Sequence, residues 1–271
     1  MESHEITPDV DAERRFGGIA RLYGAAGLAR LQAAHVCVIG IGGVGSWAAE
    51  ALARSAVGTI TLIDLDHVAE SNINRQIQAV DATLGMAKID AMAARIHSYH
   101  PTCKVLRVDD FLDEENVATL LPKCDAVIDA IDNVRAKAAL IAHCKRNKIS
   151  LVTTGGAGGR IDPTRVQVDD LARTIQDALA SNVRARLRKE YGFTRDPKKK
   201  FGVECVFSPE QLQRPAVATC DVTPEANMTT PKANGPQGLN CAGYGSSVAV
   251  TSTFGMAAAA RVIDKLLKDL A

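Results

Sequence analysis

The sequence predicts a Rossmann-like α/β fold with a mainly parallel sheet that C-terminal strands extend, plus helices at the N-terminus. Short apolar runs alternate along the chain with stretches of helical periodicity. The first apolar run, 36–39, opens directly into the glycine cluster 40–45. The second run, 59–63, ends on Asp64. This order of strand, glycine turn, helix, strand and acid is typical of a βαβ unit that holds a phosphate group.

Composition sets the bounds of this prediction. The chain has 271 residues, of which 46% are hydrophobic and only 4% aromatic. This length suits one large α/β domain with an aliphatic core. The net charge of +1 gives no global attraction to nucleic acid, so such a partner would need a local patch. The first eleven residues are polar and acidic, which favours a cytoplasmic protein without a signal peptide.

Seven cysteines are spread over the chain without any C-x-x-C pair. The odd number and irregular spacing argue against a disulfide framework. Paired spacing is also what structural zinc sites need, so we expect no zinc.

In the glycine cluster each glycine has a predicted physical role. Gly40 permits the tight turn, Gly42 lets the backbone approach a phosphate together with Gly43, and Gly45 lets the next helix pack on the strand. The helix over 46–57 then offers free N–H groups and a partial positive charge to an anion. Asp64 is placed to accept hydrogen bonds from a ribose. A close-packed turn without a ligand is the alternative.

A dense polar block after the second strand argues against that alternative. It crowds carboxylates, amides and one guanidinium beside the phosphate end of the site, and its members are Asp64, Asp66, Ser71, Asn72, Asn74, Arg75 and Gln76. An ordinary dinucleotide site does not need such a set. A triphosphate with a metal ion suits it better.

Further elements follow in order along the chain. We expect a helical N-terminal segment up to about residue 34 with a glycine break, and helices over 86–98, 113–121 and 136–145. We expect strands over 104–108, 125–130, 150–154 and 166–168, the last antiparallel. Asp132 and Asn133 follow the strand 125–130, at the edge where open parallel sheets bind ligands. Asp132 could cap the next helix or hold a metal ion with phosphates, and we favour the second interpretation.

From residue 169 the pattern changes. Leu171, Ile175, Leu179, Val183 and Leu187 repeat at helical spacing. A basic cluster on and after this helix is either a solvated face or a contact surface for RNA phosphates, and it comprises Arg184, Arg186, Arg188, Lys198, Lys199 and Lys200. The proline-rich stretch 205–238 predicts a long loop. We interpret the uncharged stretch 243–260 as a strand and a packed helix, not as a membrane span.

These motifs together resemble the ATP-binding core of the ubiquitin-activating-enzyme-like superfamily, of the MoeB and ThiF type. The matching pieces are the glycine turn, the block D-x-D-x-V-x-x-S-N-x-N-R-Q from Asp64, and the segments 85–88 and 129–133. Segments 16–24 and 152–159 look like the bacterial tRNA threonylcarbamoyladenosine dehydratase branch. Many MoeB- and ThiF-like relatives carry two C-x-x-C pairs, which this chain lacks.

The resemblance implies ATP with Mg²⁺ as cofactors and assigns site residues. Arg75 and Lys88 would neutralise charge on the phosphates, and Asp132 would hold the Mg²⁺ ion. An arginine from the N-terminal helix, Arg15 or Arg21, would reach the ATP of the other subunit in a homodimer. Cys241 could attack an adenylate, although a small buried side chain is the simpler interpretation.

The resemblance also implies a reaction and an organisation. The carboxylate of N6-threonylcarbamoyladenosine in a tRNA anticodon loop would be adenylated and then closed into a ring. Activation of a ubiquitin-like sulfur-carrier protein is the rival, and a nucleotide-binding scaffold or oxidoreductase is a third alternative. A cysteine-desulfurase relay and a monovalent cation stay open, whereas DNA and membranes are not expected. We expect one continuous catalytic domain with a helical segment (1–34), a nucleotide-binding core (35–165) and a C-terminal part (166–271) with a basic helix, a crossover loop and a closing helix.

Overall fold

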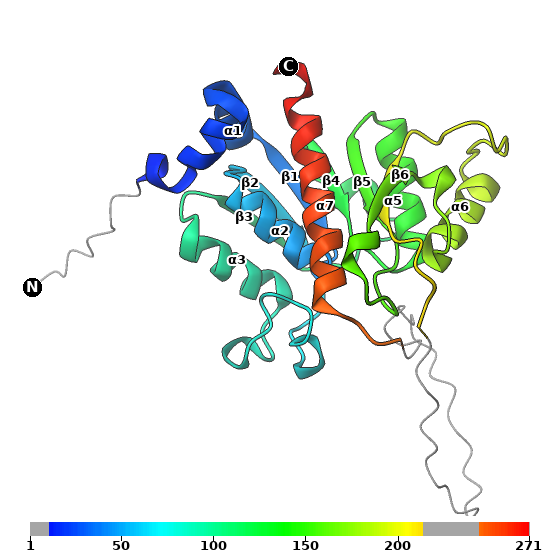
Figure 1. The fold of residues 1–271 in the computed structure, drawn as a ribbon, viewed down its shortest axis with the longest axis horizontal. Coiled ribbons are helices and arrows are strands. Elements are labelled where there is room, and N and C mark those ends of the chain that lie inside the picture. The colour runs from blue at the N-terminus through cyan, green and yellow to red at the C-terminus, as the bar shows by residue number, and fades with distance from the viewer. Residues whose placement is uncertain (1–10, 214–243, 271) are drawn as a thin grey trace, which may run out of the picture.

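The computed structural model describes residues 11–213 and 244–270 and confirms the predicted α/β fold. One seven-stranded sheet lies between two layers of helices (Figure 1). Its strands are β1 (His35–Ile39), β2 (Thr59–Ile63), β3 (Lys104–Val108), β4 (Ala126–Asp129), β5 (Ser150–Thr154), β6 (Gln167–Asp170) and β7 (Glu204–Phe207). Their order is β3-β2-β1-β4-β5-β7-β6. Only β6 runs antiparallel to its neighbour β7, as the sequence predicted.

Seven α-helices and several 3₁₀ turns connect the strands within the described residues. The helices are α1 (Ala12–Ala33), α2 (Gly45–Arg54), α3 (Lys88–Tyr99), α4 (Val117–Leu120), α5 (Val134–Arg146), α6 (Ala178–Glu190) and α7 (Val248–Leu267). The 3₁₀ turns are η1 (Glu70–Asn72), η2 (Asp81–Thr83), η3 (Pro163–Arg165), η4 (Leu171–Arg173) and η6 (Lys268–Leu270). Gly24, at φ 77°, bends α1 where the sequence predicted a glycine break.

Alternation of side chains along the buried strands builds two hydrophobic cores. In β1, Val36 and Val38 point to the face that α1, α2, α3 and α7 cover. Cys37 and Ile39 point to the opposite face, which α4, α5 and α6 cover. Every one of these four side chains is at least 98% buried. Burial on both faces is characteristic of parallel strands and explains their continuous apolar runs.

Helix α7 is packed closely onto α2 in front of the sheet (Figure 1). Gly255 permits this approach, because a Cβ atom there would lie 2.4 Å from the carbonyl oxygen of Val44. The uncharged C-terminal stretch is thus a packed helix, as expected. The strand that we predicted before it is wrong, because residues 244–247 form no strand. No helix in the described ranges combines the length and apolarity that a bilayer crossing requires.

The predicted helix starting near Leu171 is also wrong in its first part. Ile175 is 58% exposed and Gln176 adopts φ 53°, outside any helix. Helix α6 begins only at Ala178, where the Asp177 side chain caps it by accepting the Ala180 N–H.

Two other predicted segments, the loop from residue 205 and the helix over 113–121, differ in their bounds. The stretch predicted as a loop from residue 205 begins inside β7, and the helix predicted over 113–121 shortens to the single turn of α4. Most of the expected crossover loop, and Cys241 with it, lies outside the described residues.

Candidate active site

A cavity of about 1350 Å³ lies at the carboxyl ends of the parallel strands. It sits where the strand order reverses between β1 and β4, the position at which open α/β sheets bind ligands. Thirteen of the predicted site residues line it: Gly40, Gly42, Gly43, Asp64, Asp66, Ser71, Asn72, Asn74, Arg75, Gln76, Lys88, Asp132 and Asn133. The fold therefore brings the glycine turn, the polar block and the end of β4 to one site.

The glycine turn has the geometry that its sequence predicts. Gly40 adopts φ 84°, and a Cβ there would lie 2.9 Å from the carbonyl oxygen of Ala130. A Cβ on Gly45 would come within 1.8 Å of the Gly40 oxygen. A Cβ on Gly42 would meet no atom within 4 Å, because this residue borders the cavity. Two glycines thus close the turn, and Gly42 leaves backbone accessible to a ligand.

Asp64, Asp66 and Lys88 form a charged group at the end of β2. The Asp64 carboxylate accepts hydrogen bonds from the backbone N–H groups of Ile41 (2.5 Å) and Asp66 (2.8 Å). The Lys88 ammonium, only 8% exposed, lies 2.6 Å from Asp66 Oδ2 and 4.0 Å from Asp64 Oδ1. Burial raises the pKa of the Asp64 carboxyl, and Lys88 opposes this shift. The ammonium is therefore held at the cavity wall beside two acids, and the Asp66 carboxylate is largely exposed.

Arg75 is fixed beside the glycine turn by contacts on both sides. Its Nη1 donates to the Ser71 carbonyl (2.7 Å) and to Asn74 Oδ1 (3.0 Å), and its backbone carbonyl accepts from Trp47 Nε1 (2.9 Å). Its aliphatic stem packs 3.3 Å from the position of a Cβ on Gly43. Partial burial lowers the pKa of the guanidinium, which stays cationic at neutral pH. A fixed cation at this place can meet a phosphate without reorganisation.

The cap of α5 comes from Asn133 and not from Asp132. The Asn133 side chain caps α5, because its Oδ1 accepts from the N–H groups of Arg135 (2.9 Å) and Ala136 (3.1 Å). The Asp132 side chain is exposed at the cavity. Its carboxylate is not needed for the helix cap, so it can bind a cation or a polar ligand.

Several lining residues were not predicted as site residues. Among them are Phe111, Thr154, Gly156, Gly158, Tyr244 and Ser246. Phe111 follows β3 and the glycine loop follows β5, so the rule that ligands lie beyond carboxyl strand ends could have found them. Tyr244 and Ser246 precede α7 and reach the cavity only through tertiary folding. The Ser246 carbonyl accepts a hydrogen bond from Asn74 Nδ2 (3.1 Å).

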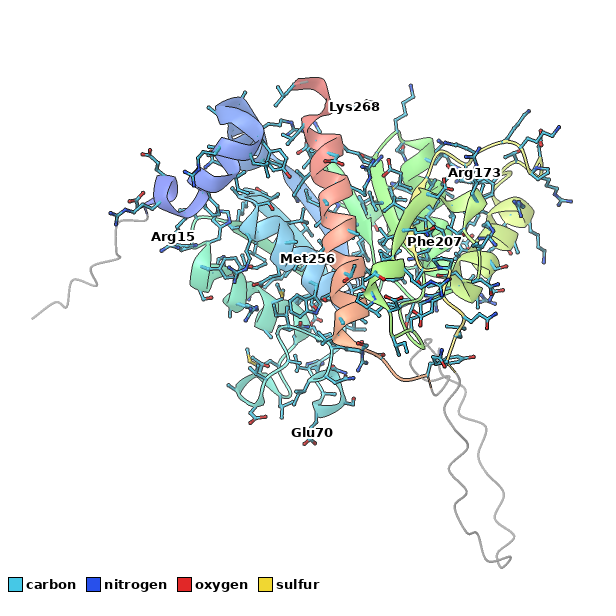
Figure 2. All side chains as sticks on the ribbon, in the orientation of Figure 1. Arg15, Glu70, Arg173, Phe207, Met256 and Lys268 are labelled. Atoms are coloured by element: carbon cyan, nitrogen blue, oxygen red, sulfur yellow. The ribbon has the colours of Figure 1, made fainter. Side chains whose placement is uncertain are left out.

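The two N-terminal arginines do not line this cavity. Figure 2 shows Arg15 on α1, well away from Glu70 at the cavity. Its Nη1 donates to the Tyr99 carbonyl (2.7 Å), whereas the Arg21 side chain donates no hydrogen bond within the described residues. A role of either residue at ATP therefore requires a second copy of the chain.

The predicted basic cluster separates into two groups. The arginines lie on α6 and are partly buried: Arg184 donates to Thr174 Oγ1, Arg186 pairs with Glu190 at 2.7 Å, and Arg188 donates to the Thr194 carbonyl at 3.3 Å. The lysines Lys198, Lys199 and Lys200 are exposed on the loop that follows. The lysines, and not the arginines, form the open cationic surface.

Residues 11–213 and 244–270 contain no disulfide bond. The five cysteines in these ranges are free, and burial raises the pKa of Cys103 to about 12 and of Cys144 to about 12. These ranges contain no group of three or more His, Cys, Asp or Glu side chains arranged to hold a metal ion.

The glycine turn leads to a prediction with an internal control. Gly42→Ala adds a methyl group that meets only the cavity, so the protein should stay folded with an unchanged melting temperature while ATP binding weakens at least about tenfold, or 1.4 kcal/mol. Gly45→Ala forces a methyl group into the Gly40 carbonyl and should strongly destabilise the fold. Calorimetric titration and thermal melting measure both effects. Equal ATP affinity of Gly42→Ala and the unmodified protein would contradict the placement of the phosphates.

Comparisons with known proteins agree with this geometry. The tRNA threonylcarbamoyladenosine dehydratases of Escherichia coli and Haemophilus influenzae are 53% and 51% identical to the chain, over 95% and 94% of both partners. The crystal structure of the E. coli tRNA N6-threonylcarbamoyladenosine dehydratase in complex with ATP matches with a TM-score of 0.84 and 49% identity, over 96% of this chain and 97% of that one.

A complex of the same E. coli protein with AMP matches with the same TM-score and identity, over 96% of this chain and 98% of that one. A molybdopterin-synthase adenylyltransferase of H. influenzae is 34% identical over only 59% of this chain and 68% of its own length. The model of the ThiF family matches residues 17–269. Together with the glycine turn and the polar cavity, this match shows that the chain belongs to the ThiF family.

Proposed function

We propose that this chain uses ATP to dehydrate N6-threonylcarbamoyladenosine in the anticodon loop of tRNA. The observation that carries the proposal is the convergence of Arg75, Lys88 and Asp132 on one cavity beside an accessible glycine turn. Such a set of two cations and one exposed carboxylate suits a nucleoside triphosphate better than a dinucleotide. Relatives that share about half of all residues carry the name of this enzyme.

The proposed reaction has two balanced steps. The substrate carboxylate attacks the α-phosphate of ATP, forming an acyl-adenylate and releasing pyrophosphate. A nitrogen of the same side chain then attacks the activated carbonyl carbon, loses its proton and expels AMP. One carboxylate oxygen leaves with AMP, so the net change in the RNA is the loss of one water molecule.

Residues of this chain position ATP and offset its charge. Arg75 and Lys88 face the phosphates, where fixed cations stabilise the charge that grows on the departing pyrophosphate. Asp64 accepts hydrogen bonds from the ribose. Asp132 would hold the Mg²⁺ ion that neutralises phosphate oxygens, and its exposed carboxylate fits that role.

The chain offers less support for activation of a sulfur-carrier protein. The related adenylyltransferase matches over a smaller share of the chain, and the paired cysteines of many such relatives are missing. The exposed lysines Lys198, Lys199 and Lys200 suit an RNA backbone. The proposed function places the protein in the cytoplasm with tRNA. A cysteine-desulfurase relay and a monovalent cation are further components that the resemblance suggests.

The proposal predicts a defined product ratio. Incubation with ATP and tRNA that carries N6-threonylcarbamoyladenosine should lower the mass of this nucleoside by one water, with one AMP and one pyrophosphate formed per cyclised residue. Asp132→Asn should slow the reaction at least about a hundredfold by removing a charged ligand at the phosphates. Asp81→Asn, an exposed acid outside the cavity, serves as the control. Nucleoside mass spectrometry and nucleotide chromatography measure the ratio, and formation of ADP would refute the mechanism.

A second prediction separates the two groups of basic residues. The triple variant Lys198→Ala, Lys199→Ala, Lys200→Ala should bind tRNA more weakly and reduce the slope of log affinity against log salt by up to about one unit per lost phosphate contact. Arg186→Gln removes a cation that already pairs with Glu190, so its salt slope should stay unchanged. Fluorescence titrations at several salt concentrations measure the tRNA affinity and its salt slope for each variant. An unaltered slope in the triple variant would exclude the loop from tRNA binding.

We infer in addition that the protein is a homodimer with shared active sites. The exposed side of α7 carries no charged residue from Val248 to Ala260 and presents Met256, which is 41% exposed. On α1, Leu22 is 70% exposed next to Arg21. Exposed apolar surface of this kind is typical of interfaces. Because Arg15 is held by Tyr99 of its own chain, Arg21 is the better candidate to reach the ATP of the partner.

Shared sites predict complementation between two inactive variants. Arg21→Ala and Arg75→Ala should each lose most activity as separate proteins. An equimolar mixture after subunit exchange should recover about a quarter of the unmodified activity, because half of the dimers are hybrids with one complete site. Arg30→Ala, on the same helix but paired with Asp125, is the control. Mixed dimers that stay inactive would rule out a shared site.

A further inference from the structure

A second cavity of about 450 Å³ adjoins the nucleotide cavity. It is formed by the first turns of α6, the segment after β7 and the segment before α7. Tyr244 lines both cavities, so they meet at this side chain. The volume lies in the range of pockets that hold one small molecule or one nucleotide.

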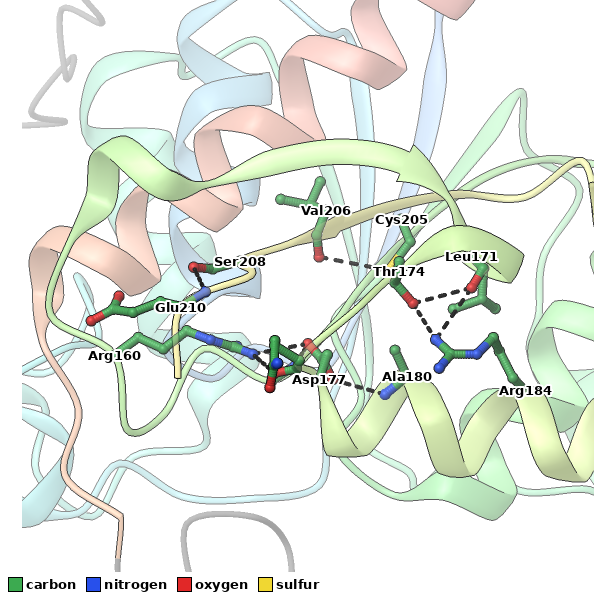
Figure 3. Close-up of polar contacts among 12 residues, drawn as sticks. Arg160, Leu171, Thr174, Asp177, Ala180, Arg184, Cys205, Val206, Ser208 and Glu210 are labelled. Atoms are coloured by element: carbon green, nitrogen blue, oxygen red, sulfur yellow. Dashed lines mark hydrogen bonds and ion pairs between the residues drawn. The ribbon is translucent and has the colours of Figure 1, made fainter. Parts of the chain in front are cut away.

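The Asp177 side chain borders the second cavity, and Figure 3 shows its contacts with Arg160 and Ala180. Asp177 is buried, and its Oδ2 accepts from the N–H of Gly156 (3.0 Å), which lines the nucleotide cavity. Its Oδ1 accepts from the N–H of Ala180 (2.8 Å). The guanidinium of Arg160, which is 2% exposed, lies 3.5 Å away. The negative charge of Asp177 is thus compensated by Arg160 and by two backbone N–H groups, so it is not available to a ligand.

The second cavity therefore offers neutral polar groups, one cation and one aromatic ring. Gln176, Gln211 and Ser181 contribute amides and a hydroxyl, and Tyr244 contributes the ring. Gln176 is held at φ 53° while its carbonyl accepts from Arg160 Nη2 (3.0 Å). Such a conformation is strained in a residue other than glycine, so the buried arginine fixes a backbone that would otherwise relax.

Arg184 supplies the cation of this cavity. Its Nη1 donates to Thr174 Oγ1 and to the Leu171 carbonyl (3.5 Å), as Figure 3 shows. Only one of its nitrogens is used in these two contacts, and a guanidinium has five N–H donors. The side chain is thus held in one orientation with donors left for a ligand, which favours a phosphate.

We propose that the second cavity binds the nucleotide adjacent to the modified adenosine of the tRNA anticodon loop. The base contacts the amides of Gln176 and Gln211 and the ring of Tyr244, and Arg184 contacts its phosphate. Proteins read single-stranded RNA through such contacts between unstacked bases, aromatic rings and hydrogen-bonding side chains. The assignment rests on the proposed function, since adjacent cavities suit adjacent nucleotides only if the first receives the modified adenosine.

The position of the exposed lysines agrees with this assignment. The second cavity lies along the first two turns of α6, and the loop with Lys198, Lys199 and Lys200 follows the other end of that helix. The thirteen residues of α6 span about 20 Å. An RNA strand that leaves the cavity along α6 would reach the lysines with its backbone.

A double-mutant cycle that combines protein substitutions with removal of an RNA base tests the assignment. The substrates are synthetic anticodon stem-loops that carry the modified adenosine, either intact or abasic at the 5′ or the 3′ neighbour. The protein variant combines Gln176→Gly, which keeps the positive φ, with Gln211→Ala. The matched control combines Gln32→Ala with Gln167→Ala, two exposed glutamines away from both cavities.

For the unmodified protein, KM should rise about tenfold with one of the two abasic substrates. The double variant should show the same rise with the intact substrate and no further rise with that abasic one, while its Kd for ATP stays unchanged. The control variant should behave like the unmodified protein. An unchanged KM of the double variant for the intact substrate would overturn the assignment. The assignment would also fail if the effects of the substitutions and of the missing base on KM multiplied with both abasic substrates. If the unmodified protein cyclises none of the RNAs, the proposed function itself fails.

Discussion

The site depends on the contact between the backbones of Gly40 and Gly45. No side chain fits between them, so the chain can reverse immediately after β1 and start α2 against the strand. The reversal brings the Ile41 N–H to the Asp64 carboxylate at the end of β2, and the Ile41 carbonyl accepts from Gln78 at 3.0 Å. Helix α7 packs against the first turn of α2 at Gly255. Strand ends, polar block and closing helix are all positioned by this one turn.

Buried ion pairs fix the loops that follow β4 and β5 and line the cavity. The charges of these pairs face each other and do not face the cavity. Lys137 and Asp129 are both at least 98% buried, with Nζ 2.9 Å from Oδ1, and Thr153 donates to the other carboxylate oxygen at 2.6 Å. The Asp129 carboxylate also accepts from the Ile131 N–H at 3.1 Å, so the pair shapes the loop that carries Asp132. Removal of one partner of such a pair costs about 3–5 kcal/mol. Arg160 and Asp177 have the same role for the glycine loop after β5.

Much of the fold and of the cavity could be predicted because local patterns report directly on them. Continuous apolar runs predict buried parallel strands, and the carboxyl ends of these strands collect the site residues. The residues at which helices begin were harder to predict from the sequence. The apolar spacing through Ile175 suggested one helix, but capping by Asp177 and the positive φ of Gln176 stop it. Whether Asp132 or Asn133 caps α5 depends on side-chain orientation, which spacing does not encode. The contribution of Tyr244 and the second cavity arise only from tertiary packing.

Every role assigned to the site follows from attack of the substrate carboxylate on the α-phosphate of ATP in this cavity. Transfer of an oxygen isotope tests it most directly. A stem-loop RNA whose threonylcarbamoyl carboxylate carries oxygen-18 is turned over with ATP, and the nucleotide products are analysed by mass spectrometry. We expect one labelled oxygen in AMP and none in pyrophosphate, because the bond that forms in the first step joins that oxygen to the α-phosphorus. Unlabelled AMP, or label in inorganic phosphate formed together with ADP, would contradict it.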